Sequence, residues 1–443
     1  MNYQEAFIAN ARAILGNDYD SFIQSLSEPS PTSIRINPYK KTSKFDSEES
    51  VSWCLNAHYL AERPSFTFDP LFHAGTYYVQ EASSMFLEQV WKQINPQNNN
   101  VRVLDMCAAP GGKSTHLASL INGNSLLVSN ELISNRNNSL QQNIVKWGMP
   151  NCIVTQNDPK DFALLNSYFD IILVDAPCSG EGLFRKDKNA INEWSEKNVS
   201  ICSARQKDIL KQAVDCLKPG GFLVYSTCTF QQVENDANME LAEELNCSNF
   251  KLENNNPAIT ATKFGLQFFP HKAKGEGFYI AVLKKNGLAD AENYQVKNIK
   301  LPIKKSPYTP LITSYLTHEK FVIHEKNEFI FAIPEFMYPD FIFLEKQLYI
   351  RHAGIYMGTT KGKDFLPSHD LALSICVNPN LASEELNYDQ AIAYLRCETP
   401  KIISEKRGWC IAQYQGHNLG WMKLLPGRIN NYFPKELRIL KQL

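Results

Sequence analysis

The sequence predicts an α/β protein whose central domain is a doubly wound parallel sheet, with an α+β region before it and β-rich modules after it. Three observations predict this class. Short, continuously apolar runs alternate with helically spaced stretches between residues 101 and 285. The first run leads directly into a loop of small residues that opens a helix, CAAPGGKST at 107–115. The length of 443 residues is also more than one ordinary domain needs.

The expected strands and helices of the central domain alternate regularly. Buried parallel strands are expected at 101–106, 125–130, 152–157, 169–176 and 221–227. Helices are expected at 112–121, 134–147 and 203–217. A further apolar run, 277–285, is expected to close the sheet. Repetition of this kind places helices on both faces of one sheet.

The remaining segments divide the chain into further regions. An α+β extension at 1–95 should hold a helix near 4–24, a short strand within 33–40 and a helix at 80–92. The predicted division continues with the central domain at 96–286, a polar, proline-punctuated linker at 287–315, a first C-terminal module at 316–380 and a second at 381–443. Residues 401–443 carry 8 Lys and Arg against 2 Asp and Glu, which favours a module that binds polyanions.

The composition excludes several other classes of protein. No apolar run reaches the roughly 18 residues that a membrane helix needs, and no secretory signal is visible at the N-terminus. The 11 cysteines have no repeating spacing, so we expect reduced thiols in a cytoplasmic protein rather than a disulfide framework. The chain has neither a CxxC motif nor a paired His/Cys motif, and no metal site is expected.

The loop at 107–115 resembles a phosphate-binding loop only superficially. That motif needs a glycine five residues before Gly112, where this chain has Cys107, and the dinucleotide motif GxGxxG is absent too. The loop nevertheless follows a strand that ends in Asp105, and small residues at 108–112 would let a ligand approach the backbone. A nucleotide-like ligand is therefore expected there.

Acidic residues follow the next two strands. Glu131 is placed to bind the two hydroxyls of a ribose, and Asp158 to accept a hydrogen bond from an adenine amino group. A ribose and an adenine without a phosphate-binding loop point to S-adenosylmethionine, a nucleoside without phosphate. The alternative is that these acids are simply solvated at the ends of strands.

Two cysteines end the fourth and fifth strands, in the motifs DAPCSG and YSTCTF. In the strand order 3-2-1-4-5, Cys178 and Cys228 would face one crevice, with Asp175 at its rim. Either cysteine alone could be a small core residue. Together with an acid they suit methylation of a pyrimidine at C5, in which a thiolate adds to C6, an acid assists at N3 and the exocyclic amine, and a base removes the C5 proton. Lys113 could help to ionise the attacking thiol.

At this point the motifs carry a family resemblance. LDMCAAPGGKSTHLAS, NDPKDF, DAPCSGEGLFRKD, YSTCTF and FFPHKAKGEGFYIAVLKK occur in the order found in RNA 5-methylcytosine methyltransferases of the RsmB/NOP2/Sun type. The resemblance implies a Rossmann-like methyltransferase domain, with Cys228 as nucleophile, Cys178 as the cysteine that helps to release the product, and S-adenosylmethionine as cofactor. The cofactor residues that it implies are Cys107, Ala108, Ala109, Pro110, Gly111, Gly112, Lys113, Glu131, Asp158 and Asp175. DNA cytosine methyltransferases use the cysteine of the PC motif, here Cys178, so the TC cysteine favours RNA.

The flanking segments resemble one branch of that family. SIRINP and HAGTYYVQEASSM match it near the N-terminus, and the C-terminal segments resemble the RsmF branch, which methylates 16S ribosomal RNA and ends in a PUA-like RNA-binding domain. The candidate phosphate contacts are Lys423, Arg428, Lys435 and Arg438, and the candidate stacking residues are Trp409, Tyr414, Trp421 and Tyr432. The expected partner is ribosomal RNA, within a small subunit or an assembly intermediate. The alternatives are methylation of transfer RNA, and a ribosome-assembly factor that binds RNA without catalysis.

Overall fold

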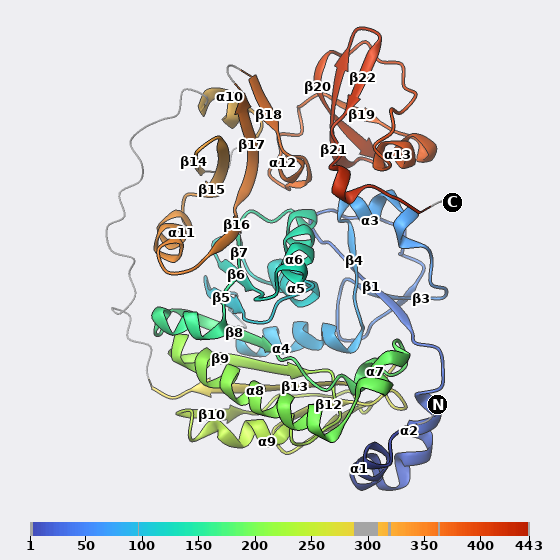
Figure 1. The fold of residues 1–443 in the computed structure, drawn as a ribbon, viewed down its shortest axis with the longest axis vertical. Coiled ribbons are helices and arrows are strands. Elements are labelled where there is room, and N and C mark those ends of the chain that lie inside the picture. Colours follow the sequence, from blue (N-terminus) through green and yellow to red (C-terminus); the bar gives the residue numbers. More distant parts are fainter. Residues whose placement is uncertain (1–2, 96, 288–308, 318–319, 362–363, 442–443) are drawn as a thin grey trace.

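The computed structural model describes residues 3–95, 97–287, 309–317, 320–361 and 364–441. These residues form four sheets, and Figure 1 shows the largest at the centre of the molecule with the two C-terminal modules at one end. Most of the predicted linker, 287–315, lies outside the described residues.

The central sheet has ten strands in the order β11-β12-β13-β9-β8-β5-β6-β7-β16, with β10 paired to β13. Its strands are β5 (Arg102–Asp105), β6 (Leu126–Asn130), β7 (Cys152–Thr155), β8 (Phe169–Asp175), β9 (Leu217–Thr227), β10 (Cys247–Phe250), β11 (Ile259–Ala261), β12 (Gly265–Phe268), β13 (Phe278–Lys285) and β16 (Ile350–Ala353). The five strands from β7 to β9 are parallel, which confirms the predicted order 3-2-1-4-5.

Both edges of the parallel part are extended by antiparallel strands. The predicted closing strand is β13, which pairs with β9. At the other edge β16 pairs with β7, although β16 comes from the segment that follows the linker. The first C-terminal module is therefore joined to the central sheet through a shared strand.

Two apolar cores cover the two faces of this sheet, because successive residues of a strand point to opposite sides. On β5, Val103 belongs to one core and Leu104 to the other, and both are fully buried. Burial of such a side chain stabilises the fold by roughly 1.5–3 kcal/mol. The covering helices are α4 (Leu87–Ile94), α5 (Gly112–Leu120) and α6 (Ser134–Trp147) on one face, and α8 (Glu196–Cys216) and α11 (Tyr338–Glu345) on the other.

The N-terminal extension combines helices with a small sheet in the order β2-β3-β1-β4. The elements are α1 (Glu5–Leu15), α2 (Tyr19–Ser25), β1 (Thr32–Ile36), β2 (Glu49–Ser50), β3 (Ala57–Leu60), α3 (Pro70–Ala74) and β4 (Tyr77–Val79). The helix predicted near 4–24 is interrupted at Gly16, which has a φ of 53° that ends α1. The helix predicted at 80–92 starts as a 3₁₀ turn, Ser83–Phe86, whose first N–H groups are capped by the Glu81 carboxylate.

The C-terminal region adds two four-stranded sheets and four short helices among the described residues. The first sheet contains β14 (Phe321–Lys326), β15 (Phe329–Pro334), β17 (Ile355–Lys361) and β18 (Asp364–Pro367), with α10 (Thr309–Ser314), α11 and α12 (His369–Leu373) around it. The second contains β19 (Ser383–Glu385), β20 (Gly408–Tyr414), β21 (His417–Leu425) and β22 (Arg428–Asn431), and α13 (Tyr388–Leu395) packs against it.

In the described part of the chain, no helix is long and apolar enough to span a membrane. The two short helices α7 (Lys188–Glu193) and α9 (Asp236–Met239) complete the central domain.

Candidate active site

A cavity of about 500 Å³ opens at the carboxyl ends of the parallel strands. Its floor is formed by the ends of β5, β8 and β9, and Tyr78, Gln80 and Glu81 of the N-terminal extension form part of its wall. The carboxyl edge is where an open α/β sheet binds its ligand, because the strands and helices diverge there. Most predicted site residues line this cavity, whereas Gly111, Glu131 and Asp158 do not; those that do are Cys107, Ala108, Ala109, Pro110, Gly112, Lys113, Asp175, Cys178 and Cys228.

The loop at 107–112 is shaped by backbone constraints that small residues satisfy. Gly111 has a φ of 111°, a conformation that residues with a Cβ rarely adopt. A Cβ added to Gly112 would lie 3.3 Å from the Tyr78 ring. The loop thus runs tightly between α6 and the extension, and the residues that line the cavity beside Gly112 are Cys107, Ala108, Ala109 and Pro110.

Asp105, at the end of β5, offers an unused acceptor at the cavity. Its Oδ2 accepts a hydrogen bond of 2.6 Å from the Ser114 hydroxyl, whereas Oδ1 has no hydrogen-bond partner among the described residues. Complete burial raises the pKa of this carboxyl to about 7, and the nearby Asp175 charge adds to the effect. A buried carboxylate with a free acceptor is suited to a donor group or a cation of a ligand.

Glu131, at the end of β6, is 5% exposed and held in place by its neighbours. Its Oε1 accepts from the Ile133 N–H at 2.9 Å, and Oε2 lies 3.4 Å from the Arg136 guanidinium. Arg136 lines the cavity and donates to the Ala109 carbonyl, so it links the acid to the loop. The remaining lone pairs of Glu131 could accept from ribose hydroxyls.

Asp158 is engaged differently from the other acids. Its side chain caps the 3₁₀ turn Pro159–Leu165 by accepting from the Lys160 N–H, in a reciprocal arrangement with Asp161. The Lys160 ammonium lies 3.5 Å from its Oδ2. A capping role accounts for the aspartate at this position, whereas Glu131 and Asp105 lie nearer to the loop.

The structure brings the two cysteines of the neighbouring strands β8 and β9 into contact. The Sγ atoms of Cys178 and Cys228 are 3.1 Å apart, and the Cys228 N–H lies 3.3 Å from the Cys178 Sγ. A hydrogen bond to Cys228, together with burial, raises the pKa of Cys178 well above its usual value. Cys178 therefore keeps its proton more strongly than an ordinary thiol and can donate it to its neighbour.

Lys113 and Asp175 form an ion pair beside these thiols. The Lys113 Nζ is 2.9 Å from the Asp175 Oδ2, and the Ser226 hydroxyl donates to the Asp175 Oδ1 at 2.8 Å. Although burial opposes it, the Asp175 carboxylate raises the pKa of Lys113 above its usual value, and Cys228 contributes in the same direction. The Lys113 side chain is therefore a charged ammonium in the cavity that the two thiols also line.

Behind the cavity, a buried carboxylate fastens the segment that follows Cys228. Glu181 accepts from the Thr229 hydroxyl, the Phe230 N–H and the Gln231 side chain. Burial raises the pKa of Glu181 to about 7, in spite of these hydrogen bonds. The Gly182 N–H also donates to the Cys228 carbonyl at 2.8 Å, so the segments after β8 and β9 are tied together.

Sequence reasoning did not identify Glu181, nor Tyr78, Gln80 and Glu81, as site residues. The last three belong to HAGTYYVQEASSM, a match that indicated family membership without indicating contact with the cavity. Neither Glu181 nor this group of three has a sequence spacing that is typical of a ligand-binding motif. Their places depend on how the extension packs on α5, where the buried Arg35 of β1 donates to the Thr115 hydroxyl at 2.7 Å.

The predicted RNA-contact residues of the second C-terminal module fall into two groups. Trp421 is 1% exposed and donates its indole N–H to the Ser368 carbonyl, so it is a core residue. Tyr432 is 38% exposed and packs against Trp409, with ring centroids 4.5 Å apart. Lys423 lies over the Trp409 ring. Tyr414 is half-buried, and Arg428, Lys435 and Arg438 are exposed.

Three family models match consecutive parts of the chain. The model for 16S rRNA methyltransferase RsmB/F matches residues 92–284, that for the N-terminal domain of RsmF matches 4–82, and that for the RsmF PUA domain matches 383–439. Curated relatives match nearly the whole length. Ribosomal RNA small subunit methyltransferase F of Aliivibrio fischeri is 30% identical over 98% of this chain and 97% of the relative, and that of Aeromonas salmonicida is 31% identical over 94% and 93%.

Solved structures match a smaller share of the chain than the curated relatives do. A methyltransferase homolog protein from Pyrococcus horikoshii is 27% identical, with a TM-score of 0.56 over 64% of this chain and 96% of that one. NSun6 from the same organism, determined with SFG, has the same fold at 19% identity, with a TM-score of 0.54 over 64% of this chain and 98% of that one. The full-length relatives and the cavity at the strand ends lead to one conclusion: the chain belongs to the 16S rRNA methyltransferase RsmB/F family, in its RsmF branch.

Proposed function

We propose that this protein uses S-adenosylmethionine to methylate C5 of cytosine in 16S ribosomal RNA, through a covalent bond between Cys228 and C6 of the base. The observation that carries the proposal is the contact of the Cys178 and Cys228 thiols in the cavity that also contains the 107–112 loop. C5 of cytosine is a poor nucleophile, and covalent addition at C6 is a way to activate it. The names of the relatives support ribosomal RNA as the substrate.

The residues around the loop fit S-adenosylmethionine. The free Oδ1 of Asp105 suits the ammonium of its amino-acid part, Glu131 suits the ribose hydroxyls, and the loop of small residues leaves room for the nucleoside. When bound, S-adenosylmethionine supplies a methyl group on a positively charged sulfur. Asp158, which caps a turn, remains a proposed adenine contact. One of its two carboxylate oxygens already accepts a hydrogen bond from the Lys160 N–H.

The side chains of this protein would divide the chemistry as follows. The Lys113 ammonium favours the Cys228 thiolate, whose sulfur adds to C6 and pushes electrons to C5. The Asp175 carboxylate, fixed by Lys113 and Ser226, accepts a hydrogen bond from the exocyclic amine of the base. After methyl transfer, a base must remove the C5 proton so that the bond between C6 and Cys228 breaks and the thiolate leaves.

Cys178 is proposed to act in that last step. Its Sγ lies 3.1 Å from the Cys228 Sγ, so it reaches the same side of the bound base. Cys178 keeps its proton in the resting site and must release it to solvent before this step. The resulting thiolate is a strong base, because the pKa of Cys178 is raised, and it can then accept the C5 proton. Reduced thiols at both positions also fit a protein of the cytoplasm.

The access of the base to this cavity limits the form of the RNA. A cytidine in a perfect duplex cannot reach a thiol at the ends of the strands unless it leaves the helix. Loops and partly assembled particles are therefore the preferred substrates. The exposed basic residues of the second C-terminal module, such as Arg428 and Lys435, would contact phosphates.

The test is to trap the covalent intermediate on a denaturing gel. Cys178→Ala protein is incubated with S-adenosylmethionine and, separately, with small ribosomal subunits, free 16S RNA and transfer RNA. We expect a slower band with 16S RNA or subunits that ribonuclease removes, because addition proceeds while release fails. The double variant Cys178→Ala/Cys228→Ala is the control and should give no band.

Each alternative has its own outcome. A stronger band with transfer RNA would show that transfer RNA is the substrate, while the covalent mechanism would stand. The protein could also give no band with any RNA, and wild-type protein that binds S-adenosylmethionine could form no 5-methylcytidine. These two results together would favour an assembly factor that binds RNA without catalysis.

A further inference from the structure

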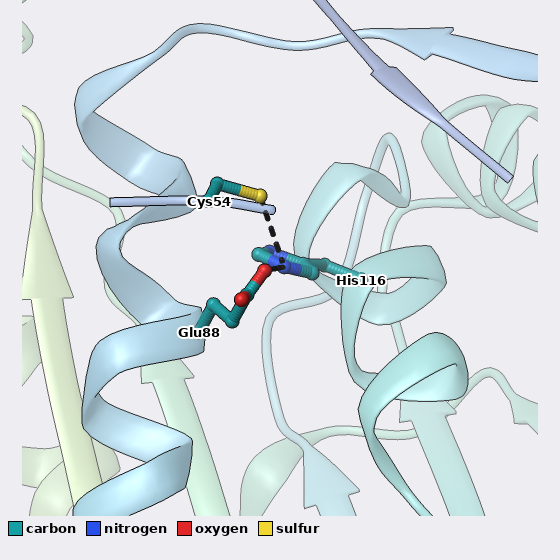
Figure 2. Close-up of side chains that lie close together, drawn as sticks. All are labelled: Cys54, Glu88 and His116. Atoms are coloured by element: carbon teal, nitrogen blue, oxygen red, sulfur yellow. Dashed lines mark hydrogen bonds and ion pairs between the residues drawn. The ribbon is translucent and has the colours of Figure 1, made fainter. Parts of the chain in front are cut away.

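A second cluster of reactive side chains lies away from the cavity, where the extension meets the central domain. Cys54 lies in the turn between the paired strands β2 and β3 of the extension, Glu88 lies on α4 and His116 lies on α5 (Figure 2). Their exposed fractions are 3%, 5% and 1%, so all three are buried. One thiol, one carboxylate and one imidazole therefore meet in a part of the protein that the proposed reaction does not use.

The contacts within the cluster are long: the thiol and the imidazole form at most a weak hydrogen bond to sulfur. The His116 Nε2 is 3.8 Å from the Cys54 Sγ and 3.8 Å from the Glu88 Oε2. A nitrogen and an oxygen 3.8 Å apart are too far for a hydrogen bond. The His116 Nδ1 also has no hydrogen-bond partner among the described residues. Because Nε2, and not Nδ1, faces the thiol and the carboxylate, the position of Nε2 is the observation that bears on a ligand of this cluster.

The same distances suit a metal ion. All three donor atoms lie within 4.8 Å of one another, and Figure 2 shows the three side chains converging from different elements. Atoms spaced in this way leave a central point about 2.2–2.5 Å from each, close to the roughly 2.0–2.3 Å at which Zn²⁺ binds sulfur, nitrogen and oxygen. We propose that Cys54, Glu88 and His116 form a structural Zn²⁺ site that fastens the N-terminal extension to α5.

The donor types and charges favour zinc over other common ions. Magnesium and calcium prefer oxygen ligands alone, whereas cysteine and histidine together are typical of zinc. The thiol would release its proton on binding, and the thiolate and carboxylate would then balance the two charges of the ion. Lys92, 2.7 Å from the Glu88 Oε1, and the buried Arg35 guanidinium are positive and oppose a cation here, so the charges of both anionic ligands are required. A water molecule or the second Glu88 oxygen would complete a tetrahedron.

The position of the site gives it a structural consequence. His116 is three residues after Lys113 on α5, and the helix begins at the 107–112 loop. An ion bound to His116, Cys54 and α4 would hold this helix against the extension, which supplies a wall of the cavity. The sequence predicts no metal site because the three ligands are separated by 28 residues or more and form no local motif.

The experiment measures metal content and ligand identity separately. Full-length protein is purified without chelators, and bound metal is determined by mass spectrometry for wild type, Cys54→Ser, His116→Gln and the control Cys152→Ser, which alters another buried thiol. We expect about one zinc ion per chain in wild type and Cys152→Ser, and a loss of at least tenfold in the other two variants.

A second measurement keeps the test independent of how well the variants fold. Wild-type protein is stripped of metal under mild conditions and titrated with Co²⁺, whose thiolate complexes absorb in the near ultraviolet. The proposal predicts a saturating thiolate–cobalt band that zinc abolishes, and a higher melting temperature when either metal is bound. The proposal is overturned if wild type carries no metal and gives no cobalt band, or if both ligand variants retain zinc as wild type does.

Discussion

The cavity at the strand ends and the second C-terminal module differ in how they place the residues that the sequence predicts to be functional. In the cavity, the Cys178 and Cys228 thiols and the Lys113–Asp175 pair project from different elements toward one space. In the module, aromatic side chains divide between the core, where Trp421 lies, and the surface, where Tyr432 lies. The ends of parallel strands bring reactive side chains together, whereas a small sheet needs most of its aromatic side chains to fill its own core.

The most direct test of this difference is to remove the thiol that is proposed to attack the cytosine. Cys228→Ala should lower methyl transfer to 16S RNA by several orders of magnitude, because the thiol proposed to bond to C6 is gone and Cys178, whose pKa is raised, keeps its proton. Single-turnover transfer of labelled methyl groups measures this, with binding of S-adenosylmethionine as the control for folding. Activity within tenfold of wild type would remove Cys228 from the mechanism.

Lys113→Met tests whether the cavity acts through its charge. The variant loses the ion pair with Asp175 and the positive charge beside Cys228, so we expect kcat to fall about 10²–10³-fold. The matched control is Lys263→Met, which removes an exposed lysine paired with Glu240 on the surface. Equal activities of the two variants would show that Lys113 only supports the structure.

The second region is tested by stability rather than by turnover. Trp421→Ala should lower the free energy of unfolding by about 3–5 kcal/mol, because it empties a core position and leaves the Ser368 carbonyl without its donor. Tyr432→Ala, at the surface, should cost less than about 1 kcal/mol and should instead weaken RNA binding. Urea unfolding separates the two; a large loss of stability in Tyr432→Ala would contradict the division into core and surface.

An effect smaller than that of Trp421→Ala concerns Glu181, behind the cavity. Its pKa is raised from 4.5 to about 7 in the folded protein, so the folded state binds the proton more tightly than the unfolded state between these values. Stability contributed by this group is therefore greatest below about pH 4.5 and is lost as the pH rises to 7. Asp105 contributes with the same sign.

In Glu181→Gln this pH-dependent part should shrink by an amount on the order of 1–3 kcal/mol, since the variant cannot titrate there. Urea unfolding at a series of pH values from 4.5 to 8 measures the change, with Glu240→Gln at the surface as the control. A profile for Glu181→Gln that is parallel to that of wild type would show that the carboxyl does not titrate in this range.

The sequence predicts the parallel sheet well because its strands are continuously apolar and its helices are regularly spaced. It also predicts that Cys178 and Cys228 meet, since both follow strands that are neighbours in the order 3-2-1-4-5. The break of the first helix at Gly16 and the capping role of Asp158 depend on local backbone geometry, which apolar periodicity does not report.

Other features required the three-dimensional structure. The cluster of Cys54, Glu88 and His116 unites three elements that are distant in sequence, so no spacing rule detects it. The pairing of β16 with β7 likewise depends on how the chain returns to the sheet after the linker. The buried state of Trp421 follows from packing within a short sheet whose two faces cannot be told apart by composition.

The central claim is that the Cys228 thiolate attacks the base and that the Cys178 thiolate does not. One measurement on the wild-type protein tests this claim. 16S RNA transcribed with 5-fluorocytidine is incubated with the protein and S-adenosylmethionine, because a fluorine at C5 cannot leave as a proton does and the covalent complex should persist. The complex is digested with ribonuclease and protease, and the modified peptide is identified by mass spectrometry. The account predicts a methylated fluorocytidine nucleotide on the peptide that contains Cys228. A nucleotide attached to Cys178 would contradict it.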